Sequence, residues 1–359
     1  MNRRDFLHVS AMAACSGVSG IAWASLPDAA PQGWRIYEVT TSVQIREGRG
    51  ATRIWLPVPL AERTPFQRTL STSIHCETGK VRRIQHASLP LVCAQFAAGA
   101  APVLTMTNRI ATRDWAVALE QPKRSGGGRE QAKAYLAATR YVPTDGIVKA
   151  RAETITKGLT TDVDKTRAVY EWVVENTHRD PKVRGCGVGD IRPMLETGDL
   201  GGKCADINAL FVGLVKASGV PARDVYGIRV GPSELSCKSL GAASGNITKS
   251  QHCRAEVYLE GFGWVPMDPA DVRKVILEEP PGTLTLNDIK VVDTRKRLFG
   301  SWEGNWIAYN YAQDVSLPGS GGPPLHFLMY PQAETADGRL DCLAPDEFRY
   351  EITTREVAA

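Results

Sequence analysis

One cysteine stands where a glycine turn leads into a long apolar helix. The turn reads Gly201-Gly202-Lys203-Cys204-Ala205-Asp206, and apolar residues follow it at helical spacing, namely Ile207, Leu210, Phe211, Leu214 and Val215. Gly219 and Pro221 end this pattern. A thiol on the first turn lies beside unpaired backbone N–H groups at the positive end of the helix dipole, which lowers its pKa from about 8.5. Cys204 is therefore either a small core residue or an activated nucleophile, and the residues downstream favour the second.

A predicted hairpin downstream supplies a histidine and an aspartate. Residues 252–268 alternate in polarity as a strand does, turn at a Glu-Gly-Phe-Gly segment and begin a return strand. This hairpin brings Asp268 near His252, and we expect a bulge between them. A thiol, an imidazole and an orienting carboxylate are the groups that covalent acyl transfer requires. Each residue alone has an ordinary structural explanation, but Cys204, His252 and Asp268 in this order predict a catalytic triad.

These segments together resemble the core of the transglutaminase-like superfamily. The similar segments are Gly202-Lys203-Cys204-Ala205-Asp206, Gly219-Val220-Pro221-Ala222-Arg223, His252 with Ala255-Glu256-Val257-Tyr258, and Gly263-Trp264-Val265-Pro266-Met267-Asp268-Pro269. The resemblance covers about residues 150–275 and implies a papain-related triad of Cys204, His252 and Asp268. It implies the fold more specifically than the reaction, because the superfamily includes crosslinking transferases, peptidases, amidases and inactive members. Arg254 stands where many relatives have an aromatic residue, and this departure bears on the shape of the acyl pocket.

The chain opens with a segment that resembles a twin-arginine export signal. Paired arginines at positions 3–4 precede a modest apolar run that ends at Ala24, after which we expect cleavage and a periplasmic location. Serines and glycines interrupt the run, so it is not expected to span a membrane. Lipid attachment at Cys15 is a second, less favoured possibility, because the apolar stretch before it is short.

The charge balance limits the partners that the chain is expected to bind. The formal net charge is +4, and loss of residues 1–24 removes two arginines and one aspartate, which leaves +3. This near balance argues against a nucleic-acid partner. No cofactor or metal is expected, since the sequence has no Cys-x-x-Cys and Asp268 with Asp271 alone does not make a calcium site. The expected partner is a peptide, protein or cell-wall amide, and no stable membrane insertion is expected.

Cysteine usage leaves the redox state open. Beyond the signal segment and Cys204, the chain has six cysteines, Cys76, Cys93, Cys186, Cys237, Cys253 and Cys342. An even number allows up to three disulfides, although reduced buried thiols explain them equally well. The best pair is Cys76 with Cys93, which are neighbours in one β-rich region. Cys253 follows His252 directly and therefore points to the opposite face of the predicted strand, so its expected role is structural.

The polarity pattern along the chain predicts an α+β protein with several units. It favours a transglutaminase-like or papain-like catalytic core, an N-terminal β-sandwich and extra C-terminal β structure. In chain order the predicted units are a signal peptide at 1–24, a sandwich at 33–120, a linker at 121–129, a catalytic domain at 145–275 and a β-rich extension at 276–359 packed on the catalytic core. Helices are predicted near 146–157 and 162–177. The glycine-rich segment 184–190 is expected to be a flexible border of the active cleft.

Two functional interpretations follow from the sequence. The first is an exported thiol enzyme that forms a thioester on Cys204 and passes the acyl group either to an amine, as a transamidase, or to water, as a peptidase or amidase. The backbone N–H of Cys204 is expected in the oxyanion hole, while a second donor is not identifiable from sequence. The second interpretation is a noncatalytic binding protein of the cell envelope that keeps the transglutaminase fold.

Overall fold

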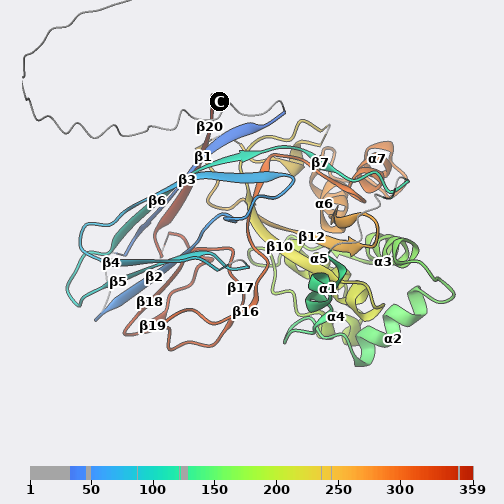
Figure 1. Cartoon of the computed structure of the whole chain (residues 1–359), viewed down its shortest axis with the longest axis horizontal. Helices are drawn as coiled ribbons and strands as arrows, with labels where there is room; N and C mark the ends of the chain where they lie inside the picture. The colour runs from blue at the N-terminus through green and yellow to red at the C-terminus, as the bar shows by residue number, and fades with distance from the viewer. Residues whose placement is uncertain are drawn as a thin grey trace, which may run out of the picture.

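The computed structural model describes residues 33–45, 50–86, 88–120, 122, 128–235, 237–243, 245–346 and 348–358. The predicted signal peptide, including Cys15, and most of the predicted linker lie outside these residues. The described part is a mixed α/β structure with a β-rich N-terminal region, which confirms the predicted fold class. A β-sandwich lies beside a layer of helices, with strands β10 (Ala222–Arg229) and β12 (Gln251–Leu259) between the two (Figure 1).

The sandwich consists of two five-stranded sheets. The first has the order β11-β20-β1-β6-β3, with β11 (Gly245–Asn246), β20 (Tyr350–Val357), β1 (Arg35–Gln44), β6 (Val103–Thr112) and β3 (Gln67–His75). The second has the order β19-β18-β2-β5-β4, with β19 (Gly338–Arg339), β18 (Gln332–Thr335), β2 (Thr52–Pro57), β5 (Leu91–Phe96) and β4 (Lys80–Ile84). Alternate residues of β1, Tyr37 and Val39 among them, join Ile54 and Leu56 of β2 in one apolar core between the sheets.

Strands from the C-terminal part of the chain complete this sandwich. β20 pairs with β1 along Ile36–Val43, and β18 pairs with β2 at Arg53–Trp55. The expectation placed all of residues 276–359 on the catalytic core; instead β15 (Trp306–Asn310) pairs with β10 on that side, while β18 and β20 join the sandwich. Alternation along a strand indicates which of its faces is buried, but not which distant strand supplies its hydrogen-bond partners.

The predicted disulfide between Cys76 and Cys93 is not formed, and all seven described cysteines are free thiols. Cys93 lies in a cluster with Trp55 on one face of its sheet. Cys76 packs against the sandwich core on the other face. The two thiols thus pack in different apolar clusters on either side of this sheet, so they are not placed to form a disulfide.

The predicted catalytic domain is built on an antiparallel sheet of order β13-β12-β10-β15, with β13 (Gly263–Met267) and β15 (Trp306–Asn310) at its edges. Its helices are α2 (Gly146–Ile155), α3 (Asp162–Asn176), α4 (Ile191–Thr197), α5 (Cys204–Ala217), α6 (Pro269–Glu278) and α7 (Ile289–Arg297). Helix α5 begins at Cys204 and ends before Gly219, as predicted. It is buried along nearly its whole length because the sheet, α2 and α3 all pack against it.

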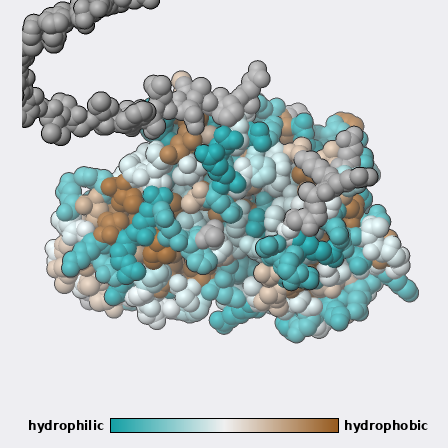
Figure 2. Space-filling model, in the orientation of Figure 1, coloured by the Kyte–Doolittle hydropathy of each residue, from teal (hydrophilic) through white to brown (hydrophobic). Residues whose placement is uncertain are grey.

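Short elements connect these layers. They are β7 (Trp115–Ala116), α1 (Arg129–Ala132), β8 (His178–Arg179), β9 (Gly201–Gly202), β14 (Ser301–Trp302), β16 (Gln313–Val315), β17 (Leu325–Phe327) and 3-10 turns at Lys133–Leu136 and Lys238–Leu240. No described helix is long and apolar enough to cross a membrane. Figure 2 shows a largely hydrophilic face on which the hydrophobic areas gather mainly over the sandwich.

The catalytic sheet and the sandwich share their apolar core. Ile228 and Val230 at the end of β10, with Ile307 on β15, belong to the same buried cluster as the sandwich strands. Phe66 packs edge-on against Trp302, 5.2 Å between ring centroids, and extends the contact between the two parts. The sheet that carries the candidate site therefore rests on a rigid base.

Candidate active site

The turn before α5 is fixed by the carboxylate of Asp206. Its Oδ2 accepts a hydrogen bond from the Lys203 N–H at 2.9 Å, while Oδ1 accepts from the N–H groups of Val188 and Gly189 at 2.9 and 2.8 Å. An acidic side chain at this position satisfies orphan donors at the helix start. The segment 184–190, expected to be flexible, is thus tied to the first turn of α5.

Glycine is required at Gly187 because its φ of +94° is unfavourable for other residues, and a Cβ there would collide with the Asp206 carboxylate. The backbone of Cys186 is also tied to the helix, since its carbonyl accepts from the Ala205 N–H at 2.9 Å. These contacts bring the thiol of Cys186 close to that of Cys204.

The predicted imidazole–carboxylate pair is present. His252 Nε2 lies 2.7 Å from Asp268 Oδ2. Asp268 is the N-cap of α6, where its Oδ1 accepts from the Asp271 N–H at 3.1 Å and from Asn208 Nδ2 at 3.2 Å. Trp306 Nε1 donates to the His252 carbonyl at 2.8 Å and so fixes the backbone of the imidazole.

The predicted bulge between His252 and Asp268 is not found in the paired strands. The register is regular from Ala255 opposite Met267 to Leu259 opposite Gly263. Asp268 follows the last paired residue, and its helix-capping conformation turns the carboxylate toward the imidazole. The N-cap conformation of Asp268, and not a bulge, therefore brings its carboxylate to the imidazole of His252.

The thiol of Cys204 is surrounded by hydrogen-bond donors. The side chains of Cys186, Cys253 and His252 hold the pKa of Cys204 well below its usual range, outweighing burial, which raises it. The pKa values of Cys186 and Cys253 are raised well above the usual range, so these two thiols stay protonated beside the Cys204 thiolate, and the Cys186 thiol donates to the Gln251 carbonyl at 3.2 Å. Cys204 carries that charge because it alone stands at the start of a helix.

Cys253 consequently contributes to the site instead of being only structural. It faces α5 with Ala255 and Val257 in the helix-side core, as strand alternation predicts. Cys204 is the first residue of α5. The side chains of Cys253, on this face of the strand, and of His252, at the end of the strand, both lower its pKa.

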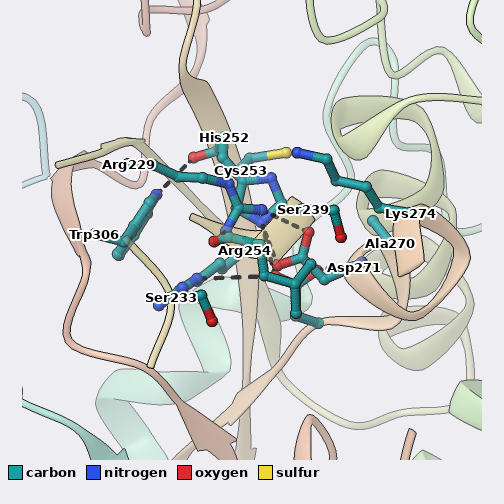
Figure 3. A network of polar contacts seen from close by, with 12 residues as sticks. Arg229, Ser233, Ser239, His252, Cys253, Arg254, Ala270, Asp271, Lys274 and Trp306 are labelled. Atoms are coloured by element: carbon teal, nitrogen blue, oxygen red, sulfur yellow. Dashed lines mark hydrogen bonds and ion pairs between the residues drawn. The ribbon is translucent and has the colours of Figure 1, made fainter. Parts of the chain in front are cut away.

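A second carboxylate, Asp271, lies behind the imidazole. Its Oδ2 is 3.5 Å from His252 Nε2, and its Oδ1 is 2.6 Å from a guanidinium nitrogen of Arg229. Burial and Arg229 lower the pKa of His252, but Asp271 and Asp268 raise it by more, so the net pKa is raised. In Figure 3, Arg229, His252 and Asp271 converge, with Trp306 and Lys274 on opposite sides of the group.

The two carboxylates differ in their environment. Burial raises the pKa of Asp271, but Arg229 and His252 outweigh it and hold that pKa well below the usual range. Burial and the charge of Asp271 raise the pKa of Asp268. Asp271 is thus the permanent negative charge behind the imidazole, while Asp268 makes the short contact with it.

Arg254 lies beneath the site and does not line the cavity. It donates to the Glu303 carbonyl at 2.9 Å, and its Nε is 3.8 Å from Asp268 Oδ2. Its guanidinium packs over the Trp306 ring, 4.8 Å from the centroid. Burial and the nearby Arg229 lower its pKa to about 10. The departure from the family pattern therefore alters the support of Asp268, not the acyl pocket as expected.

Cys204 and His252 lie at the inner end of a cavity of about 440 Å³. Both residues are almost fully buried, at 4% and 3% exposure, so the cavity is their route to a substrate. Its described lining is Arg179, Arg184, Gly185, Cys186, Lys203, Cys204, Arg229, Gly241, Thr248, Lys249, Ser250, Gln251, His252, Lys274, Tyr330, Leu343, Pro345 and Tyr350.

One group of described residues has the spacing of metal ligands. The donor atoms of His252, Asp268 and Asp271 lie within 4.8 Å of one another. Arg229 and Asn208 already engage the two carboxylates, and the guanidinium of Arg229 would repel a cation placed there. These contacts fit an internal charge network better than a metal site.

Comparisons with known proteins agree with this geometry. An antiparallel sheet is backed by a buried helix that starts at a cysteine, and residues 149–269 match the family model of the transglutaminase-like superfamily. This segment of the chain is therefore similar to a transglutaminase-like domain.

Two further comparisons extend the similarity beyond the segment that the family model matches. An uncharacterized protein of Haemophilus influenzae is 41% identical over 232 residues, which are 62% of this chain and 62% of that protein, less than two thirds of its length. The structure of a candidate cysteine protease from Cytophaga hutchinsonii is similar with a TM-score of 0.51 at 13% identity, over 90% of this chain and 98% of that chain. The periplasmic domain of TgpA from Pseudomonas aeruginosa is less similar, with a TM-score of 0.32 at 13% identity, over 64% of this chain and 90% of that chain.

Several residues of the site escaped the sequence analysis. Asn208 stands one helical turn after Cys204, and this i, i+4 spacing could have indicated a second polar residue on the same face. Asp271 follows Asp268 by three residues, the spacing of a capped first turn. No local pattern marks Arg229 or Cys186, because each reaches the site through tertiary packing.

Proposed function

We propose that the protein is a thiol enzyme that acts on amide bonds through Cys204, His252 and Asp268. The observation that carries this proposal is the geometry: a cysteine at the start of a helix lines the same cavity as an imidazole that a buried carboxylate holds at 2.7 Å. The lowered pKa of Cys204 agrees with it. Structural cysteines in apolar surroundings have raised pKa values instead. The noncatalytic alternative does not account for this arrangement, because binding alone requires no thiolate.

In the proposed reaction, the Cys204 thiolate attacks the carbonyl carbon of an amide, and the carbonyl oxygen becomes an oxyanion. His252 Nε2 is engaged by Asp268, so Nδ1 is the nitrogen that faces the thiol and protonates the departing amine. The carbon–nitrogen bond breaks and a thioester forms on Cys204. Water or an amine then attacks the thioester, gives its proton to His252 and expels the Cys204 thiolate, which yields hydrolysis or transamidation and restores the starting ion pair.

We further propose that the chain is exported, with residues 1–24 as a twin-arginine signal. The paired arginines and the weakly apolar run support this proposal. Replacement of both arginines by lysine should leave the precursor in the cytoplasm, as measured by cell fractionation. An unchanged periplasmic fraction would contradict a twin-arginine route.

The reaction is tested by incubating envelope peptides and proteins with the wild type and with Cys204→Ala, followed by mass spectrometry. Loss of ammonia with a new lysine linkage identifies transamidation, and addition of water with chain cleavage identifies hydrolysis. Cys204→Ser is the matched control, because it keeps the size of the side chain and removes the low pKa. Absence of any Cys204-dependent product would favour the noncatalytic alternative.

A further inference from the structure

The cavity above Cys204 is strongly basic. Of the described residues that line it, six are basic and none is acidic, and the basic ones are Arg179, Arg184, Lys203, Arg229, Lys249 and Lys274. This contrasts with the whole chain, in which 43 basic residues face 39 acidic ones. The positive charge is therefore a local property of the site.

Nearby acids compensate only part of this charge. Arg184 pairs with Asp341 at 2.8 Å, Arg229 with Asp271 at 2.6 Å, and Glu278 serves both Arg179 and Lys274. Among the residues that the structure describes, neither Lys203 nor Lys249 forms an ion pair. In the ion pairs of the described residues, three carboxylates thus engage four of the six cations and leave Lys203 and Lys249 without one.

The electrostatics of Lys274 reflect this excess. Its side chain is 16% exposed, and its pKa is lowered by burial and by the positive charges of Arg229 and Arg179, despite the attraction of Asp271 and Glu278. The Cys204 thiolate does not remove the excess, since its charge is balanced by the His252 imidazolium in the proposed ion pair.

A buried hydrogen-bond donor without a partner also lies on this cavity. The amide nitrogen of Gln251 has no hydrogen-bond partner among the described residues, and the residue is only 8% exposed. A buried polar group without a partner is costly, so it indicates a position where an acceptor binds. Gln251 lines the same cavity as Cys204 and His252, so this donor opens onto the space that holds the reacting groups.

We propose that the substrate of Cys204 is an acidic peptide, whose carboxylate binds in the cavity between Lys203 and Lys249 while Gln251 donates to an oxygen of the same segment. This inference rests on the proposed thiol chemistry and adds the charge of the substrate to it. A cavity that holds excess positive charge in low-dielectric surroundings concentrates anions and accelerates their binding.

The test compares two alkylating reagents on the full-length protein at pH 7. Iodoacetate is anionic and iodoacetamide is neutral, and both alkylate a thiolate with loss of iodide. We expect the iodoacetate-to-iodoacetamide rate ratio at Cys204 to exceed the ratio for glutathione by about tenfold or more. The excess should disappear near 1 M salt, where the Debye length is about 3 Å.

Variants assign the preference to the cavity. Lys203→Gln with Lys249→Gln should lower the rate ratio toward that of glutathione while iodoacetamide still reacts. Lys157→Gln is the matched control, because Lys157 is exposed and does not line the cavity. Two small molecules show which carboxylate is bound. Protection of Cys204 by N-acetylglutamine indicates an α-carboxylate, and protection by the α-amide of N-acetylglutamate indicates a side-chain carboxylate. Protection by neither indicates that no carboxylate is bound.

The outcomes separate the two proposals. Rapid reaction of Cys204 with both reagents, no preference for iodoacetate and no protection would overturn the acidic substrate and leave the thiol enzyme standing. Reaction with both reagents no faster than an ordinary thiol would overturn the thiol enzyme itself. A charge preference that survives in the double lysine variant would also overturn the proposed binding position.

Discussion

The buried pair of Arg229 and Asp271 can be tested by replacing Asp271 with asparagine. Both side chains are 3% exposed and 2.6 Å apart, so the substitution leaves a guanidinium charge buried without its partner. Breaking a buried ion pair in this way costs about 3–5 kcal/mol. Asparagine keeps an oxygen that can still accept from Arg229, and the carbonyl of Leu240 accepts from it as well. We therefore expect the free energy of unfolding to fall by ~3 kcal/mol.

Two measurements report on the Asp271→Asn variant. Guanidinium unfolding followed by circular dichroism gives the free energy of unfolding. NMR titration of the ring protons, assigned with His252→Gln, gives the pKa of His252. That pKa should fall, because Asp271 raises it and Arg229, left unopposed, lowers it. Since the folded pKa of Asp271 lies below its unfolded value, its contribution to stability is complete at neutral pH and is lost as the pH falls through the folded pKa.

Controls distinguish the charge from the packing. Asp288→Asn changes a half-buried aspartate at the start of α7, where the asparagine oxygen can still accept from Thr285, so it should cost far less stability than Asp271→Asn. The double variant Arg229→Met with Asp271→Leu removes both charges, so it should recover much of the lost stability without restoring the pKa of His252. The reasoning is refuted if Asp271→Asn is as stable as Asp288→Asn, or if the pKa of His252 stays the same or rises.

Three further predictions concern the surroundings of the thiol. Cys186→Ala removes the largest influence that lowers the pKa of Cys204, so the pH profile of its alkylation by iodoacetamide should move to higher pH. Gly187→Ala should destabilise the protein by ~2 kcal/mol or more in guanidinium unfolding, because the new Cβ collides with a carboxylate, while Gly198→Ala, at φ +74° with open space around it, should cost only about 1 kcal/mol. Trp306→Phe removes the indole donor to the carbonyl of His252 and should cost ~1–3 kcal/mol in the same assay.

The parts of the site that the sequence predicted are those with local signals. A cysteine between a glycine turn and an apolar helix indicates where the thiol lies, since the helix start fixes its surroundings within a few residues. The position of Asp268 near His252 follows from a short hairpin. The cap that aims the carboxylate is also local, because Pro269 begins α6 directly after it.

The remaining features depend on contacts between distant segments. Asp271 pairs with Arg229 of β10, 42 residues away in the sequence, and no local sequence pattern around either residue predicts this pair. Cys76 and Cys93 lie close in sequence, yet their thiols pack in different apolar clusters on opposite faces of a sheet. β20 pairs with β1 more than 300 residues away in the sequence, a partner that periodicity does not specify.

The pairing of β20 links the sandwich to the cavity. β20 joins β1 on one side and β11 on the other, and β11 is followed directly by the residues that lead into β12. Ile352 of β20 accepts from the Ile247 N–H at 2.8 Å and donates to Thr248 Oγ1 at 2.9 Å. Thr248 and Lys249 line the cavity, and three residues after Lys249 the chain reaches His252. The last strand of the chain thus holds one side of the cavity in place, so the sandwich supports the geometry of the site as well as the stability of the fold.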